Sequence, residues 1–224
     1  MRRFLRENSL GLAFGLLFVV TLVGQAFAGH ADFNQRQLSE GLSPVSLGRY
    51  VTSASFAVDV TENWQSEYLQ FFLYIFLTVW LLQKGSPESK ELHKAGRESD
   101  EDQMVGAHAT DTSPVWARVG GLRGALFSHS LGLVMGVIFL LSWLAQSISG
   151  VAAYNEEQLG NLQDPVSWDR YLLQPDFWNR TLQNWQSELL AVTSMVVLSI
   201  YLRQRGSSQS KPVGAAHAAT GVEG

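Results

Sequence analysis

Two glutamates are the residues whose type and position could carry chemistry in this chain. Glu67 and Glu188 each end a five-residue motif, Asn-Trp-Gln-Ser-Glu, that occurs twice. Each motif lies where a polar segment gives way to an apolar run, which predicts a carboxylate near the outer surface of a membrane. Such a group either binds a proton or cation, or forms an ion pair with an arginine. Arg49 and Arg170 are the candidates for that pair, because they are the basic loop residues present in both copies.

Amide side chains are the second group of candidates. Gln25 and Gln146 lie toward the outer ends of two apolar stretches. An amide inside a bilayer normally finds a hydrogen-bond partner on a neighbouring helix. The two glutamines therefore either hold helices together or coordinate a transported solute. Asn63 and Asn184, which open the two motifs, are further candidates for polar contacts between helices.

Recognisable catalytic and cofactor motifs are missing from the sequence. The chain has no cysteine, which excludes thiol catalysis, thiolate metal sites and disulfides. It lacks the phosphate-binding, zinc-protease and serine-hydrolase signatures. A formal net charge of −4 provides no basic surface for nucleic acid. We therefore expect no catalytic residue, metal, cofactor or nucleic-acid partner.

The apolar stretches predict helices that cross a membrane. Residues 9–29 and 130–150 carry no charge, and at about 1.5 Å per residue each covers the roughly 30 Å hydrocarbon core. Shorter charge-free runs at 68–83 and 189–202 must extend backward through the motifs to reach that length. This predicts two more helices, at about 56–83 and 177–203.

A gapless internal repeat organises the chain. Residues 9–90 align with 130–211, so the first helix has a counterpart in mid-chain and is predicted to be retained, although Ala28 could otherwise end a signal peptide. We predict a first repeat at 1–90, a flexible cytoplasmic linker at 91–118, a second repeat at 119–206 and a flexible tail at 207–224. Each copy crosses the membrane twice, so the two copies have parallel orientations.

The basic residues predict the orientation of the chain in the membrane. Of the 16 lysines and arginines, the two outer loops at 30–62 and 151–183 contain only Arg36, Arg49, Arg170 and Arg180. Cytoplasmic segments of membrane proteins are enriched in these residue types. Both termini and the linker are therefore predicted to lie in the cytoplasm of a multi-pass inner-membrane protein.

Glycine and tryptophan residues predict where the helices pack on one another and where they meet the membrane surface. Small residues four apart let transmembrane helices approach closely. Such helix packing is predicted at Gly11, Gly15, Gly132 and Gly136. The motif residues Trp64 and Trp185 are predicted to anchor their helices at the outer interface, where tryptophan is enriched.

Each outer loop is predicted to contain a short helix along the membrane surface. Ser43-Pro44 and Asp164-Pro165 place a capping residue before a proline, a signal for a helix start. A second capping residue, Ser55 in one copy and Asp176 in the other, is predicted to begin the long motif-bearing helix.

Four segments together resemble a known family. They are the N-terminal run Arg-Arg-Phe-Leu-Arg-Glu-Asn-Ser-Leu at 2–10, Pro-Val-Ser at 44–46, the paired Asn-Trp-Gln-Ser-Glu motifs, and Gln-Lys-Gly-Ser-Pro-Glu-Ser-Lys at 83–90. This pattern is similar to the bacterial family known as domain of unknown function 6766, over nearly the whole chain except linker and tail. The resemblance implies a bacterial inner-membrane protein and implies no activity or residue roles.

The combined prediction is an all-α integral membrane protein with four transmembrane helices, built as two tandem parallel helical-hairpin repeats with short outer-surface helices. Its predicted role is a non-enzymatic interaction or accessory subunit, whose partners are the lipid bilayer and other membrane proteins or a second copy of itself. The alternative is a small channel or transporter that uses the paired glutamates and glutamines. A membrane enzyme is the third interpretation, and no residue favours it.

Overall fold

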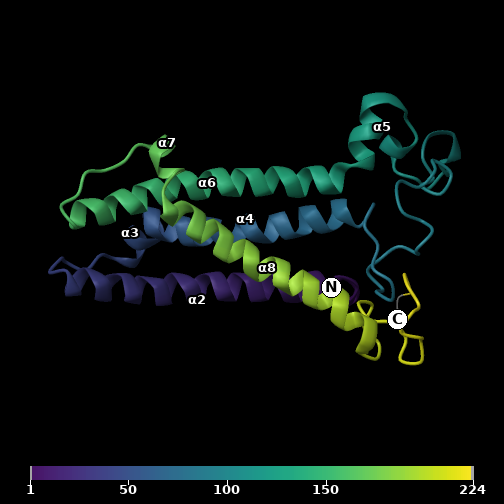
Figure 1. Ribbon diagram of the computed structural model, residues 1–224, viewed down its shortest axis with the longest axis horizontal. Helices are drawn as coiled ribbons and strands as arrows, with labels where there is room; N and C mark the ends of the chain where they lie inside the picture. Colours follow the sequence, from purple (N-terminus) through teal and green to yellow (C-terminus); the bar gives the residue numbers. More distant parts are fainter. Residues whose placement is uncertain (1, 223–224) are drawn as a thin grey trace. The chain divides into compact units, whose positions relative to one another are not determined.

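The regular structure of the chain is entirely helical. The computed structural model describes residues 2–222, and this range contains no strand. The long helices are α2 (Ser9–Ser39), α4 (Ala54–Leu77), α6 (Ser130–Gly160) and α8 (Pro175–Tyr201), and Figure 1 labels each of them. The short elements are α1 (Arg2–Glu7), α3 (Leu47–Val51), α5 (Gly121–Ser128), α7 (Trp168–Tyr171) and the 3₁₀ turns η1 (Gly106–His108) and η2 (Val115–Ala117). The predicted all-α class is confirmed.

The chain forms two compact units, each built from two segments. The first unit contains residues 1–61 and 145–172, which include α2, α3, the C-terminal half of α6 and α7. The second contains residues 62–144 and 173–224, which include most of α4, the rest of α6 and all of α8. The two motifs therefore belong to the same unit.

Both α2 and α6 continue past the predicted ends at residues 29 and 150. α2 ends at Ser39, where Gly41 adopts φ +75° and the Leu42 N–H donates to the Gln37 carbonyl at 2.8 Å. α6 ends in the same way, with Leu162 at φ +57°. A left-handed residue after the last turn terminates a helix, whereas the first polar residue does not. The predicted ends were wrong because they followed the charge-free runs.

The short outer helices begin later than predicted. α3 starts after Ser46, whose hydroxyl accepts a hydrogen bond from the Arg49 N–H at 3.3 Å, and α7 starts after Ser167. Starts at 43–44 and 164–165 are therefore wrong. The cause is a side-chain clamp in each loop. The Asn34 amide bonds both backbone groups of Val45 at 2.8 and 3.0 Å, so these groups are paired outside the helix.

The motif-bearing helices also differ from their predicted bounds. α4 begins at Ala54, where the Ser53 hydroxyl accepts from the Phe56 N–H, and it ends at Leu77 rather than 83. The carbonyl of Val79 accepts from the Gly96 N–H at 2.7 Å, so the chain has already left the helix there. α8 spans Pro175–Tyr201, which lies close to the predicted 177–203. Its first residue is a proline, which suits the first turn of a helix.

The first unit has a core built around two tyrosines. Tyr50 is 2% exposed and Tyr171 is 1% exposed. Each tyrosine ring lies directly against a helix glycine, Gly29 for Tyr50 and Gly150 for Tyr171, where a Cβ would collide with the phenol. Burial raises the pKa of the Tyr50 phenol, and the nearby charge of Asp59 adds to this effect. The phenol is therefore neutral at physiological pH, as its apolar surroundings require.

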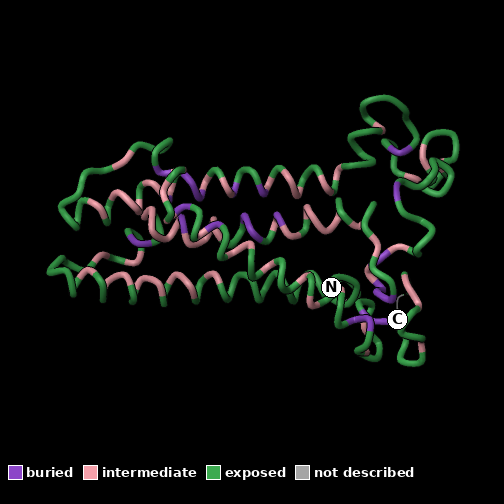
Figure 2. The backbone as a smooth tube through the Cα atoms, viewed as in Figure 1, coloured by how far each residue is buried: buried purple, intermediate pink, exposed green. Residues whose placement is uncertain are grey.

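Two of the helices, α2 and α6, are long and apolar enough to cross a membrane. α2 contains no buried residue, and Figure 2 draws it in the exposed and intermediate colours. Helices α4 and α8 do not meet the same criterion of length and composition within the described residues. Two candidate spans are thus established, where four were predicted.

Candidate functional site: the paired motifs of α4 and α8

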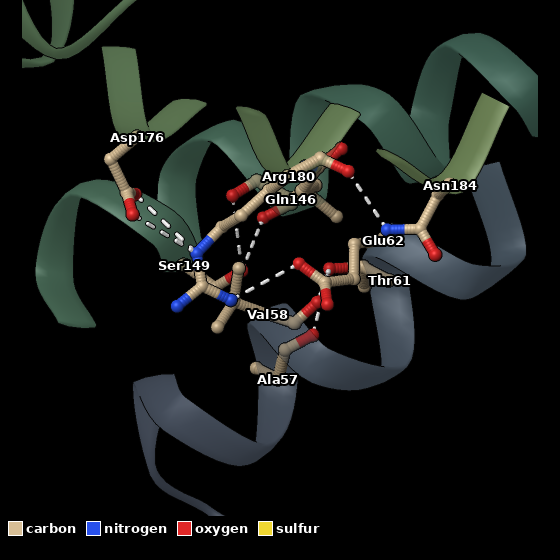
Figure 3. Close-up of polar contacts among 10 residues, drawn as sticks. Ala57, Val58, Thr61, Glu62, Gln146, Ser149, Asp176, Arg180 and Asn184 are labelled. Carbon is tan, nitrogen blue, oxygen red and sulfur yellow. Dashed lines mark hydrogen bonds and ion pairs between the residues drawn. The ribbon is translucent and has the colours of Figure 1, made fainter. Parts of the chain in front are cut away.

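An ion pair joins α4 to α8 just before the motifs. The Arg180 guanidinium contacts the Glu62 carboxylate at 3.2 Å, and it also contacts Asp176 of its own helix at 3.4 Å (Figure 3). The Glu62 side chain is 16% exposed and the Arg180 side chain 35%. The Asn184 amide donates to the Arg180 carbonyl at 2.9 Å. One arginine thus lies between carboxylates from two helices and links α4 to α8.

The two motifs bind each other directly through a tryptophan and a glutamine. The Trp185 indole N–H donates to the Gln65 side-chain oxygen at 2.7 Å. Gln65 is 0% exposed, and the neighbouring Ser66 is 1% exposed. The Gln65 amide nitrogen, Nε2, is buried and has no hydrogen-bond partner among the described residues. A buried donor without an acceptor costs about 1–3 kcal/mol, so this amide marks a place where an oxygen acceptor would be favoured.

Aromatic rings surround the Trp185 side of this contact. The Trp143 ring of α6 lies 5.6 Å from Trp185, 6.2 Å from Phe177 and 5.6 Å from Phe139, measured between ring centroids. Trp178 meets Trp143 edge-on at 6.2 Å. Aromatic pairs at these separations each add about 0.5–1.5 kcal/mol beyond their burial. The cluster therefore holds Trp185 in position for its bond to the glutamine.

The two candidate glutamates lie within electrostatic range of each other. Glu188 interacts with the Glu67 carboxylate and with the Ser66 hydroxyl, and it is half-buried whereas Glu67 is exposed. The described residues contain no group of three or more histidine, cysteine, aspartate or glutamate side chains suited to a metal ion. The use of the two carboxylates as a proton or cation site stays a prediction.

A family model confirms the resemblance seen in the sequence. A family model described as domain of unknown function DUF6766 matches residues 1–222. The chain belongs to this family. Neither a curated protein nor a solved structure matches the DUF6766 chain. The family assignment therefore stands on the match along nearly the whole chain, and the description attaches no activity to it.

The arginines proposed for the glutamates of the DUF6766 chain lie in its other unit. Arg49 and Arg170 are both exposed. Arg49 lines a cavity of about 340 Å³ together with Tyr50 and Glu156. Their pairing with Glu67 and Glu188 stays a prediction, while the observed ion pair across α4 and α8 uses Glu62 and Arg180, two residues that sequence reasoning did not select.

The other predicted polar residues differ in their burial. Gln146 is 1% exposed, whereas its counterpart Gln25 is half-buried. Asn184 bonds within α8, and Asn63 lies at the surface of α4. Trp64 is 40% exposed, whereas Trp185 of the second motif is half-buried. The two motifs are identical in sequence and occupy unequal environments.

The four predicted packing glycines also differ between the two copies. A Cβ on Gly136 would lie 3.1 Å from the Phe72 ring, and one on Gly132 would lie 3.8 Å from Ile75. α6 therefore packs closely on α4 at this position. Added Cβ atoms on Gly11 and Gly15 would meet no described atom within 4 Å.

Two recurring features of this DUF6766 chain were given no structural role in the sequence analysis. The Asn34 clamp on Val45 recurs as the Asn155 amide bonding both backbone groups of Val166 at 2.8 and 2.9 Å. The segment at 83–90 recurs at 204–211 and makes equivalent hydrogen bonds. Identity between the two copies was the signal that could have identified both features.

Proposed function

We propose that this DUF6766 protein is a multi-pass protein of the bacterial inner membrane in which α2, α4, α6 and α8 each span the bilayer as two tandem hairpins. The exposed surface of α2 carries the proposal. None of its residues is buried, and Leu10 and Phe14 are 73% and 66% exposed. Each such side chain left in water forgoes about 1.5–3 kcal/mol of burial, which a lipid environment would restore.

Polar residues in α4 and α8 are compatible with membrane depth when they are paired. The Trp185–Gln65 bond and the Glu62–Arg180 ion pair satisfy groups that would otherwise be costly in lipid. Their position before the apolar halves of both helices fits the outer interface. This supports α4 and α8 as spans although they do not meet the criterion of length and composition that α2 and α6 meet.

Within the membrane the proposed role is that of a non-enzymatic interaction or accessory subunit. The motif residues Gln65 and Trp185 bond to each other, which is a structural use of the polar groups. Gly136 is engaged by Phe72, while Gly15 meets no described atom within 4 Å of an added Cβ. Close association of α2 with another membrane helix would use this glycine surface.

Cysteine labelling tests the topology, because the chain has no cysteine of its own. Single variants Ser43→Cys and Asp164→Cys should react with a membrane-impermeant maleimide in intact spheroplasts. The variants Glu101→Cys and Ser208→Cys should react only after lysis. Equal labelling of all four before lysis, or release of the protein by a carbonate wash, would refute the multi-pass topology.

Purification in mild detergent tests the accessory role. A membrane partner or a second copy should co-purify in defined stoichiometry, and Gly11→Leu with Gly15→Leu should abolish that association. The matched substitution Gly160→Leu, at a glycine that also meets no described atom within 4 Å of an added Cβ, should leave it intact. Monodisperse protein without any partner would count against this role.

A small channel or transporter is the second candidate, and the buried Gln65 amide favours it. Its Nε2 donor has no acceptor among the described residues, and the Glu67 and Glu188 carboxylates lie nearby along the same helices. This function predicts proton or cation flux in reconstituted vesicles that Glu67→Gln with Glu188→Gln abolishes. Flux that is absent, or unchanged by the double substitution, would exclude it.

A further inference from the structure

The segment that follows α8 repeats a turn that follows α4. The Gln83 N–H donates to the Ser89 hydroxyl at 2.9 Å, and the Gln204 N–H donates to the Ser210 hydroxyl at 2.9 Å. Each serine hydroxyl then donates to the carbonyl of the lysine that follows it. The repeated sequence Gln-basic-Gly-Ser-x-x-Ser-Lys thus closes the same tight turn twice.

The lysines that end these two turns have different surroundings. The Lys90 ammonium forms an ion pair with Glu98 at 2.5 Å and donates to the Gly96 carbonyl at 2.9 Å. Lys211 is 1% exposed, and its contacts are all with backbone carbonyls. These are Gly85 at 2.5 Å, His217 at 2.9 Å, Ala219 at 3.1 Å and Ala216 at 3.3 Å. A buried ammonium requires such acceptors, because desolvation otherwise destabilises its charge.

Further bonds attach the C-terminal segment to the first turn. The Gly85 N–H donates to the Thr220 hydroxyl at 2.9 Å, and the Gly221 N–H donates to the Ser86 carbonyl at 3.1 Å. Gly85 adopts φ +87°, and a Cβ there would lie 2.9 Å from Ile200. Ser86 is 0% exposed. The C-terminal segment therefore bonds three backbone groups of this turn, which are the Gly85 N–H and the carbonyls of Gly85 and Ser86.

We infer that residues 85–86 form a binding site for a lysine-bearing peptide segment folded in turns around its ammonium, and that residues 211–221 of the same chain occupy it as a strap. The strap ties the end of α8 to the turn after α4, so it sets the spacing of the two helices that carry the paired motifs. The carbonyls of the strap surround the ammonium on one side, and the Gly85 carbonyl completes the set. Lysine is required because its ammonium supplies three donors from one compact group.

The second turn shows what the site looks like without a strap. Gly206 corresponds to Gly85, and an added Cβ on Gly206 would meet no described atom within 4 Å. Gly206 and Arg205 line an open cavity of about 320 Å³ at that turn, and the first residues of the strap, from Lys211 to Val213, line its other side without covering Gly206. The two turns make the same hydrogen bonds, but the glycine of the first is covered and the glycine of the second is open. The strap, and not the turn itself, therefore accounts for the covering of Gly85.

Hydrogen exchange of the full chain in detergent tests the strap, whether or not the protein spans a membrane. In Lys211→Met the amides of Gly85 and Gly221 should exchange about tenfold faster, the factor expected when a hydrogen bond to a charged group is lost. The Gln83 amide, which bonds within its own turn, should keep its rate. Lys90→Met is the matched control and should leave the Gly85 and Gly221 amides unchanged.

Two further measurements keep the inference testable if Lys211→Met does not fold. Thr220→Val removes only the acceptor of the Gly85 N–H, and should speed exchange at that amide alone. A Glu91→Cys with Val222→Cys pair should be cross-linked by a short bis-maleimide, because Gly221 lies against Glu91 in the strapped chain. Failure of this cross-link, or equal exchange at Gly85 in the parent and in Thr220→Val, would overturn the strap.

Discussion

The bond between the two motifs should cost more stability when it is broken at Trp185 than when it is broken at Gln65. Trp185→Phe keeps an aromatic ring beside Trp143 but removes the indole N–H that bonds Gln65. The Gln65 amide would then have neither of its polar atoms paired at a position that is 0% exposed. An unsatisfied buried group costs about 1–3 kcal/mol, so Trp185→Phe should destabilise the protein by roughly 2–3 kcal/mol.

Gln65→Leu should cost less, although it breaks the same bond. It leaves the Trp185 N–H without an acceptor, which costs about 1–3 kcal/mol, but it also removes the unpaired Nε2 and its comparable cost. The net change is expected within about 1 kcal/mol. In the double variant no polar group of the pair remains, so its loss of stability should be smaller than the sum of the two single losses.

Equilibrium unfolding measures these differences. The protein in mild detergent would be titrated with sodium dodecyl sulfate, and helix content would be followed by circular dichroism. Trp64→Phe is the matched control, because Trp64 holds the same motif position and is 40% exposed, so its effect should be small. A Gln65→Leu loss equal to or greater than that of Trp185→Phe, with additive losses in the double variant, would refute the reasoning.

Three other substitutions have expected outcomes. Leu162→Gly should stabilise the protein by about 0.5–1 kcal/mol in the same titration. Leu162 has φ +57° and is 96% exposed, so glycine would relieve the backbone strain without loss of packing. This gain exceeds the extra conformational entropy that glycine loses on folding. Gly136→Leu should destabilise by about 1–3 kcal/mol, because its side chain meets the Phe72 ring, and an unchanged midpoint would contradict that contact. The hydrogen bond from Lys90 holds the pKa of Glu98 below its usual 4.5, so the ion pair should persist above that pH and be lost as pH falls through the lowered value. An NMR titration should find the pKa of Glu98 higher in Lys90→Met.

Helix ends illustrate how far local sequence carries a prediction. Gly41 is a recognisable stop after α2, because glycine adopts the left-handed backbone of a helix terminus without steric cost. Leu162 performs the same task after α6, and its residue type carries no such signal. The repeat was the available guide, since the two residues occupy equivalent positions in the two copies.

The sequence alone determined the helical class, the internal repeat, the family and the location of the two motifs. These properties follow from the length of the apolar runs and from identity between segments, and both can be read directly along the chain. Tertiary structure decided which atoms meet. It pairs Trp185 with Gln65 and Glu62 with Arg180, and it surrounds the Lys211 ammonium with four carbonyls. Two identical motifs acquire different partners because each side chain bonds to whatever the packed helices bring within reach, and packing is a property of the whole chain.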